Sequence, residues 1–244
     1  MVLSESVVTI QRSRTACRSP LPWGARSRTA CRSPLPWGAD LFVAGTDTTT
    51  STLEWAMTEV LANPHIMAKA KDELSQVIGK GKILVENDVL RLPYLQNIVK
   101  ETLRIHAPVP LLLPRKLQSQ IKLNGYMIPK GTQVFVNAWA IEHDLTLWQD
   151  LLDLKPERFS VLGIDVQGCD FELIPFGGGL RICPGLPLAM RMVPMMLGSL
   201  LNFDWKLECG IGSNEFDLTE KFGLTLQKAE PPRAIRTLVA KSFI

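Results

Sequence analysis

The segment PFGGGLRICPG, residues 175–185, places one cysteine, Cys183, behind a glycine-rich loop. Arg181 lies two residues before the cysteine, and the apolar segment 186–201 follows closely. A thiol at the start of a helix lies at the positive end of the helix dipole, and a nearby arginine adds positive charge, so the thiolate is favoured. Glycines let backbone amides come close to the sulfur or to a flat ligand. The alternative is an ordinary buried cysteine after a glycine-rich turn.

The spacing of this segment resembles the heme-binding signature of the cytochrome P450 family, Phe-x-x-Gly-x-Arg-x-Cys-x-Gly. The resemblance implies that Cys183 is the axial ligand of the iron of heme b. A thiolate ligand at that position increases electron density on the iron and favours cleavage of the O–O bond. It also implies that the other fixed positions of the signature bind the cofactor: Phe176, Gly179, Arg181 and Gly185.

The segment AGTDTT, residues 44–49, resembles the oxygen-activation segment of the family's long central helix. The resemblance assigns Asp47 and Thr48 as an acid–alcohol pair that delivers protons on the distal side of the heme. A hydroxyl can donate a hydrogen bond there, and a carboxylate can relay protons through water. The alternative is that residues 46–52 are a threonine-rich helix whose hydroxyls bond back to the preceding turn.

Two further segments, ETLR at 101–104 and PERF at 156–159, resemble the family's Glu-x-x-Arg helix and the segment that completes its ion-pair network. Taken alone, Glu and Arg three residues apart are usually an exposed helical pair. In the family the network of Glu101, Arg104 and Arg158 is structural and holds the cysteine loop on the proximal side. Buried charges of this kind must be paired and hydrogen-bonded.

The resemblance also assigns residues to the heme edge and to the substrate. Arg115 and Arg181 match positions that bind the heme propionates, a natural use of the guanidinium fork, although either could be a solvated arginine. Five apolar residues are expected to face the substrate, with a core role as the alternative for most of them: Val109, Leu111, Leu112, Phe222 and Leu224.

Length and composition indicate a globular protein of 244 residues, 46% hydrophobic and 21% charged. Because family members are about twice this length, we expect the upstream half to be missing, with its membrane anchor and most of the distal roof over the substrate. The sequence has no run of about 18 apolar residues, so we expect no membrane-spanning helix. The resemblance covers residues 40 to about 236 and implies a partial heme domain over residues 40–244.

Residues 1–39 form a head of different composition, in which RSRTACRSPLPWGA occurs twice, at 12–25 and 26–39. Two copies are too few for a repeat architecture, and the Arg/Pro-rich composition predicts disorder. The head carries six arginines against Glu5, a net charge of +5, so the rest of the chain sums to −2. This distribution gives no reason to expect a nucleic-acid partner.

The five cysteines are scattered, without a Cys-x-x-Cys pair, and indicate a reducing compartment rather than a disulfide framework or a zinc site. The pattern predicts a mainly α fold with small β hairpins, which fits the C-terminal half of the cytochrome P450 fold. We expect helices over 40–62, 64–79, 93–105 and 186–201, with Asp40 as the first cap. We expect hairpins at 121–128 and 222–226, and a strand entering a short helix over 131–140.

The resemblance implies a heme-thiolate monooxygenase that inserts one oxygen atom into a small lipophilic substrate. The partners would be O2 and an NADPH-dependent cytochrome P450 reductase, at the cytosolic face of the endoplasmic reticulum membrane. Segments 92–95, 112–116 and 171–176 look most like plant microsomal members that oxidise terpenoid alcohols. Two alternatives stay open: a truncated, non-catalytic heme-binding or inert fragment, and a fragment that folds only through another protein.

Overall fold

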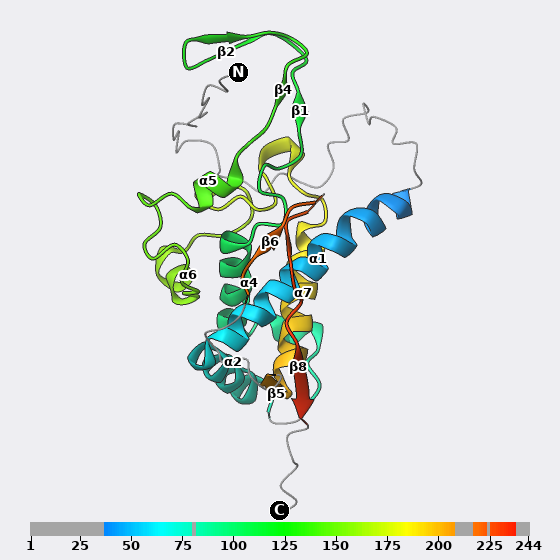
Figure 1. Ribbon diagram of the computed structural model, residues 1–244, viewed down its shortest axis with the longest axis vertical. Coiled ribbons are helices and arrows are strands. Elements are labelled where there is room, and N and C mark those ends of the chain that lie inside the picture. Colours follow the sequence, from blue (N-terminus) through cyan, green and yellow to red (C-terminus); the bar gives the residue numbers. More distant parts are fainter. Residues whose placement is uncertain (1–36, 80–81, 208–216, 224, 238–244) are drawn as a thin grey trace, which may run out of the picture.

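Three helices that pack against one another form the centre of the computed structural model (Figure 1). They are α1 (Trp37–Ala62), α4 (Pro93–Ile105) and α7 (Leu186–Leu201). Two shorter helices lie beside them, α2 (Pro64–Val77) against all three and α3 (Glu86–Val89) against α7. The structure describes residues 37–79, 82–207, 217–223 and 225–237, so the predictions for residues 1–36 and for Leu224 lie outside it.

The helix boundaries follow from proline and from one long-range cap. Pro64 and Pro93 each occupy the first turn of a helix, where a missing N–H is harmless. The carboxylate of Glu73 accepts hydrogen bonds from the backbone N–H groups of Tyr94 and Leu95, at 2.8 and 2.9 Å, and so caps α4 from α2. The predicted helix ends at residues 62 and 105 are confirmed, whereas the second helix ends at Val77, two residues before the stop predicted at Gly79.

The predicted start of the first helix at Asp40 is wrong by three residues, because α1 begins at Trp37. In the sequence, Pro36 directly precedes this start. A proline fits the first turn of a helix but not its interior. The proline therefore marks the boundary better than the carboxylate does.

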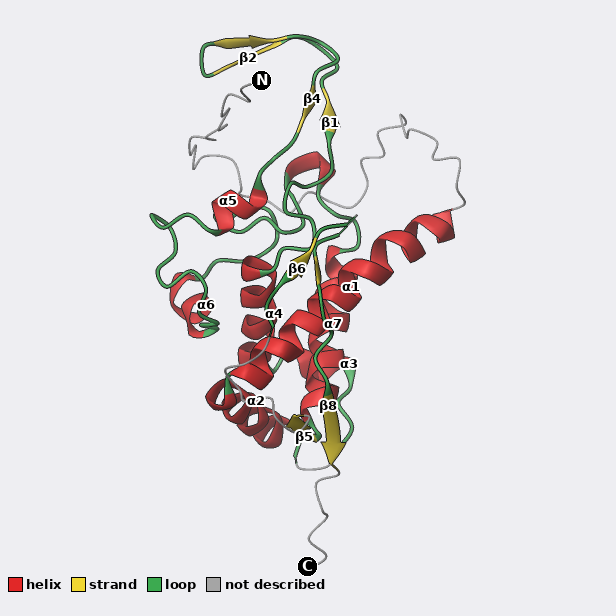
Figure 2. Ribbon diagram, viewed as in Figure 1, coloured by secondary structure: helices red, strands yellow, loops and turns green. Residues whose placement is uncertain are grey.

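In the part of the chain that the structure describes, the β structure consists of four two-stranded antiparallel pairs (Figure 2). The β2–β3 hairpin extends from one end of the molecule, and β5–β8 lies at the other (Figure 1). The pairs are β1 (Arg115–Lys116) with β4 (Gln133–Val134), β2 (Ile121–Leu123) with β3 (Tyr126–Ile128), β5 (Asp204–Leu207) with β8 (Ala234–Thr237), and β6 (Glu220–Lys221) with β7 (Gln227–Lys228).

Both predicted hairpins are present. In the first, Asn124 and Gly125 have φ values of 47° and 87°, the left-handed backbone that a tight Asn-Gly turn requires. In the second, the paired strands β6 and β7 lie just outside the predicted range 222–226, one on each side of it. Strand β4 leads to α5 (Ala138–Glu142) as predicted, and α6 (Glu157–Leu162) follows.

Among the described residues, the apolar core has two parts. The larger cluster fills the space between α1, α2, α4 and α7, and includes Leu95, Ile98 and Leu197. The smaller cluster lies around Trp148 and includes Phe159, Val166 and Leu173. Two partly buried side chains, Phe176 and Met190, contact both clusters. The segment 186–201 is therefore a core helix, as predicted.

The structure confirms a mainly α fold with small β hairpins. Within the described residues, each helix is too short or too polar to cross a lipid bilayer.

Gly198 of α7 gives a direct test of the core packing. A Cβ added there would lie 2.8 Å from Leu84 and 2.9 Å from Leu95. We predict that Gly198→Val lowers the free energy of unfolding by about 1–3 kcal/mol, because the surrounding leucines must move. The matched control is Gly45→Val in α1, because a Cβ added at Gly45 meets nothing within 4 Å. This variant should change the free energy of unfolding by less than about 0.5 kcal/mol. Urea unfolding measures the free energy for both variants, and equal losses would contradict the close packing around Gly198.

Candidate functional site

The cysteine loop is a compact turn closed by backbone hydrogen bonds. Gly177 and Gly179 have φ values of 71° and 66°, which favour glycine. The N–H of Cys183 donates to the carbonyl of Phe176 at 3.0 Å and closes the loop. The side chain of Cys183 is a free thiol, partly exposed, and α7 begins three residues later at Leu186. The sulfur therefore lies at the N-terminal end of a helix, as the sequence predicts.

The glycines of the signature keep the surroundings of the sulfur open. A Cβ added to Gly185 would lie 3.6 Å from Sγ of Cys183, in direct contact with the sulfur. A Cβ added to Gly179 would meet nothing within 4 Å, so that position faces open space. These two positions leave room for a flat ligand to approach the loop.

Strand β1 and the segment before it approach the cysteine loop. A Cβ on Gly177 would lie 3.6 Å from Cδ1 of Leu112 and 3.8 Å from Nη2 of Arg115. The structure thus brings Arg115, predicted at the propionates, and Leu112, predicted at the substrate, to one side of the loop. Arg181 lies in a short 3₁₀ turn, Gly179–Arg181, and is exposed.

Gly168 also shapes the loop, and the sequence analysis missed it. Its φ is 75°, and a Cβ there would lie 2.9 Å from the carbonyl oxygen of Gly177 and 3.0 Å from Cδ1 of Ile182. Only glycine allows this approach between the two backbones. The sequence holds no short-range signal for it, because the contact spans nine residues without a recognisable motif.

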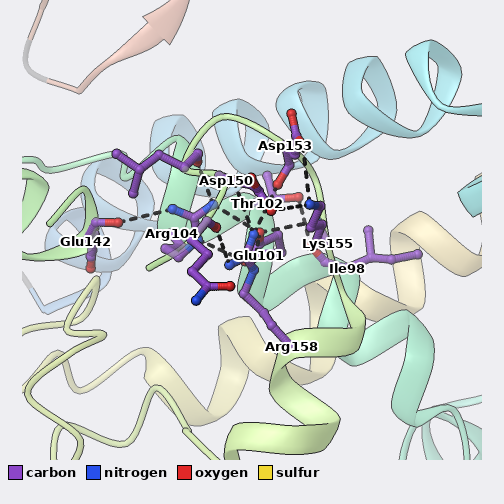
Figure 3. Close-up of polar contacts among 11 residues, drawn as sticks. Ile98, Glu101, Thr102, Arg104, Glu142, Asp150, Asp153, Lys155 and Arg158 are labelled. Atoms are coloured by element: carbon purple, nitrogen blue, oxygen red, sulfur yellow. Dashed lines mark hydrogen bonds and ion pairs between the residues drawn. The ribbon is translucent and has the colours of Figure 1, made fainter. Parts of the chain in front are cut away.

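The buried Glu101–Arg104 pair is the best-defined polar feature of the site (Figure 3). Both side chains are 0% exposed. Nε and Nη2 of Arg104 donate to the two carboxylate oxygens of Glu101 at 2.9 and 3.0 Å, a bidentate geometry. Nη1 of Arg104 also donates to the backbone carbonyl of Glu142, and Nη2 to that of Leu151. The pair is therefore completely desolvated, and every nitrogen of the guanidinium group has a hydrogen-bond acceptor.

Arg158 of α6 completes the network, as the sequence predicts. Its Nε lies 2.8 Å from Oε1 of Glu101, an ion pair whose N–H does not point at the oxygen. Its terminal nitrogens donate to backbone carbonyls of the preceding loop, at Gln149, Asp150 and Asp153. The ring of Trp148 lies within 6 Å of both guanidinium groups. Glu101 thus ties α4 to the whole 149–158 segment.

Glu142 connects this network to the cysteine loop and was also missed. Its backbone carbonyl accepts from Arg104, and its Oε1 accepts from the N–H of Ile174 at 3.1 Å, two residues before Phe176. Burial raises the pKa of Glu142 well above its usual value, while the Ile174 N–H and the charge of Arg104 lower it in part. A continuous polar path therefore runs from Glu101 to the start of the loop.

The helical position of the predicted acid–alcohol pair is confirmed, but not its role. The hydroxyl of Thr48 donates to the carbonyl of Ala44 at 2.7 Å, and Thr46 and Thr52 make the same bond one turn back. Asp47 is exposed. This geometry is that of a threonine-rich helix whose hydroxyls bond back to the preceding turn. A proton-delivery role for Thr48 therefore stays a prediction.

Two segments with predicted substrate residues lie side by side. The N–H of Leu226 donates to the carbonyl of Pro108, which places the β6–β7 hairpin beside the segment that begins at Val109. The hydroxyl of Ser51 in α1 binds the carbonyl of Leu226 at 2.9 Å. Val109 and Leu112 are partly buried, whereas Leu111 and Phe222 are 41% and 76% exposed.

These features define a site that presents a free, partly exposed cysteine: a glycine loop, a following helix and a buried ion-pair network behind them. Comparison with known proteins identifies the class. The family model of cytochrome P450 matches residues 38–231. The chain therefore belongs to the cytochrome P450 family.

Individual relatives extend the comparison. A geraniol 8-hydroxylase from Catharanthus roseus is 64% identical over 197 residues, which cover 80% of this chain and 40% of that protein. A 7-ethoxycoumarin O-deethylase from Helianthus tuberosus is 65% identical over 193 residues, 79% of this chain and 39% of that protein. A zebra fish cytochrome P450, in a structure with abiraterone, matches with a TM-score of 0.73 and 31% identity over 82% of this chain and 46% of that chain.

The chain spans about two fifths of the length of the curated relatives it matches. The resemblance to plant members of the family is confirmed by relatives from Catharanthus roseus and Helianthus tuberosus.

The buried network can be tested by removing one charge. We predict that Glu101→Gln lowers the free energy of unfolding by about 3–5 kcal/mol, because Arg104 and Arg158 are left without a counter-charge. The matched control is Glu157→Gln, which removes a surface pair to Lys69 whose side chains are about half exposed, and should cost under about 1 kcal/mol. Urea unfolding of both variants measures the difference, and comparable losses would contradict the structural role of Glu101.

Proposed function

We propose that the chain forms the heme-binding part of a heme-thiolate monooxygenase. In this proposal one oxygen atom of O2 enters a small lipophilic substrate, with electrons from an NADPH-dependent cytochrome P450 reductase. The observation that carries the proposal is the free thiol of Cys183, held by its own N–H bond to Phe176 at the start of α7. Membership of the cytochrome P450 family supports it.

The residues around Cys183 fit heme b. Cys183 would be the axial ligand, because its thiol is free and partly exposed, and Gly185 leaves the sulfur uncovered. Arg115 and Arg181 would bind the propionates as charge-assisted hydrogen-bond donors. Phe176 and Gly179 would shape the loop surface against the ring. When bound, heme supplies the oxidative chemistry, and the protein supplies ligand, orientation and protons.

The other predicted residues would act on protons and substrate. The Thr48 hydroxyl donates a hydrogen bond to the carbonyl of Ala44, and its oxygen can still accept a hydrogen bond from water or a ligand. The exposed carboxylate of Asp47, next to it in the chain, would exchange protons with solvent. Val109, Leu112 and Phe222 would offer an apolar surface to the substrate, since the hairpin and the 109–113 segment lie side by side.

We propose a terpenoid alcohol such as geraniol as the substrate class. The support is the 64% identity to a geraniol 8-hydroxylase over most of this chain. We also propose the cytosolic face of the endoplasmic reticulum membrane as the location of the protein, because segments 92–95, 112–116 and 171–176 resemble plant microsomal members of the family.

A second candidate function is heme binding without catalysis. The exposure of predicted substrate residues favours it, because Leu111 and Phe222 are open to solvent and an efficient oxidation needs an enclosed site. A carbon-monoxide difference spectrum of the reduced, heme-loaded chain tests both candidates for thiolate ligation. Oxidation of geraniol with reductase and NADPH then separates them: turnover supports the monooxygenase, and its absence supports heme binding alone.

The ligand assignment gives the next prediction. Cys183→Ala should abolish the thiolate band of the carbon-monoxide spectrum, because Cys183 alone follows the glycine loop. The control is Cys169→Ala, which changes an exposed cysteine and should leave the spectrum unchanged. By sequence, replacement of Cys17, Cys31 or Cys209 should be equally silent. A thiolate band retained in Cys183→Ala would refute the assignment.

The role of Thr48 gives a separate prediction. We expect Thr48→Ala to bind heme like the parent chain but to form several-fold less product per NADPH consumed. The reason is that the substitution removes a hydroxyl that takes part in proton delivery and leaves cofactor binding intact. The matched control is Thr46→Ala, which removes a hydroxyl with the same back-bond in the same helix. Product analysis alongside NADPH consumption measures the ratio. An unchanged ratio in Thr48→Ala would make Thr48 an ordinary helix residue.

A further inference from the structure

His106 lies where three elements meet, directly after α4. Its backbone N–H donates to the carbonyl of Thr102 at 2.8 Å and ends the helix. Its side chain is only 7% exposed. The imidazole stacks on Trp55 of α1, with ring centroids 3.7 Å apart and the planes 8° from parallel. The ring is therefore fixed in position and orientation.

Both ring nitrogens of His106 face a carboxylate. Nε2 lies 2.8 Å from Oε1 of Glu59 in α1, and Nδ1 lies 3.5 Å from Oε1 of Glu220 in β6. A neutral imidazole has one N–H and can donate to one of them, whereas the imidazolium can donate to both. The nearer contact joins two buried side chains, and the farther one reaches an element of the β6–β7 hairpin.

The other described attachments of that hairpin come from the same neighbours. Ser51 binds the carbonyl of Leu226, and the N–H of Leu226 binds the carbonyl of Pro108. The ammonium of Lys228 lies 5.6 Å from the ring centroid of Trp55. Only Glu220 attaches strand β6 to the protein beneath it through a charge, among the described contacts.

We propose that His106, Glu59 and Glu220 form a latch that positions the β6–β7 hairpin, and that the latch closes when His106 is protonated and loosens when it is neutral. The hairpin connection carries Phe222. The consequence for substrate positioning rests on the proposed function, but the latch itself does not.

The other charged groups around His106 do not reproduce this arrangement. Lys228 of β7 donates to the backbone carbonyl of Asp217 and stands against Trp55. Burial raises the pKa of Glu54 in α1, and the charge of Lys228 lowers it in part. Arg104 of α4 is held by Glu101. His143, after α5, has a pKa lowered mainly by burial; the Trp139 carbonyl raises it in part, the charges of Arg104 and His106 lower it, and the charge of Glu220 raises it.

The pKa of His106 supports the direction of the switch. Burial alone lowers it, but the carboxylates of Glu220 and Glu59 raise it by more, so the pKa lies above its ordinary value of 6.5. A raised pKa in the folded state means that the imidazolium stabilises the fold fully below pH 6.5. This stabilisation is lost as the pH rises through the raised pKa.

Amide hydrogen exchange of the 244-residue chain, followed by NMR from about pH 6 to about pH 9, tests the latch across the range in which histidine titrates. The probes are the amides of Leu226 and Ala229, which bind the carbonyls of Pro108 and Thr219. After correction for the intrinsic pH dependence, their protection should fall several-fold as the pH rises. The amide of Gly131, bound to the carbonyl of Leu117 beside β1, should show no such fall.

Variants separate positioning from simple structural support. His106→Gln and Glu220→Gln should each flatten the pH profile of Leu226 and Ala229. Glu220→Gln is the milder substitution, because the side chain of Glu220 is 35% exposed. It therefore keeps the test informative if His106→Gln does not fold. Two control variants replace other titratable groups nearby. His143→Gln removes a neighbouring imidazole, and Glu230→Gln removes an exposed carboxylate after β7. Both should keep the pH dependence of protection at Leu226 and Ala229.

Two outcomes would overturn the latch. One is a flat profile in the parent chain. The other is a profile that persists in both His106→Gln and Glu220→Gln, with protection lowered by the same factor at every pH. The measurement uses neither heme nor O2 nor reductase. A failure of the proposed monooxygenase activity would therefore leave the result for the latch unaffected, and the reverse also holds.

Discussion

The buried carboxylate of Glu101 is the constraint on which the rest of the structure depends. It is completely removed from water, and it faces the guanidinium groups of Arg104 and Arg158. Such a group is tolerated only when every charge has a partner, so the segments that supply those partners cannot move independently. Helix α4, the loop before α6 and, through Glu142, the approach to the cysteine loop are thereby fixed to one another.

The apolar contacts follow the same arrangement. Phe176 packs between the two core clusters, and its carbonyl receives the N–H of Cys183. The thiol is therefore positioned by one hydrogen bond to a residue that the core immobilises. Close packing of this kind transmits small displacements, since protein interiors have few voids. The orientation of Cys183 thus depends on both the ion-pair network and the core.

The C-terminal end of α4 joins the two halves of the candidate site. Glu101 and Arg104 face the network behind the cysteine loop, whereas His106 faces the hairpin beside the predicted substrate segment. Both connections are electrostatic, but they differ in response to pH. The arginines stay charged at every accessible pH, while a histidine changes charge near neutrality. The arginine contacts behind the cysteine loop therefore keep their charge, whereas the contact of His106 with the hairpin changes with pH.

The sequence by itself determined the features that depend on near neighbours. Pro64 and Pro93 set helix starts, Asn124-Gly125 set a hairpin, and the signature around Cys183 predicted the glycine-rich cysteine loop. Tertiary structure alone decided the contacts between distant segments. Gly168 against Gly177, Glu142 on Ile174, and His106 between Glu59 and Glu220 join residues whose spacing in the chain carries no periodic signal. Local conformational preferences act within a few residues, whereas these contacts exist only once the helices have packed.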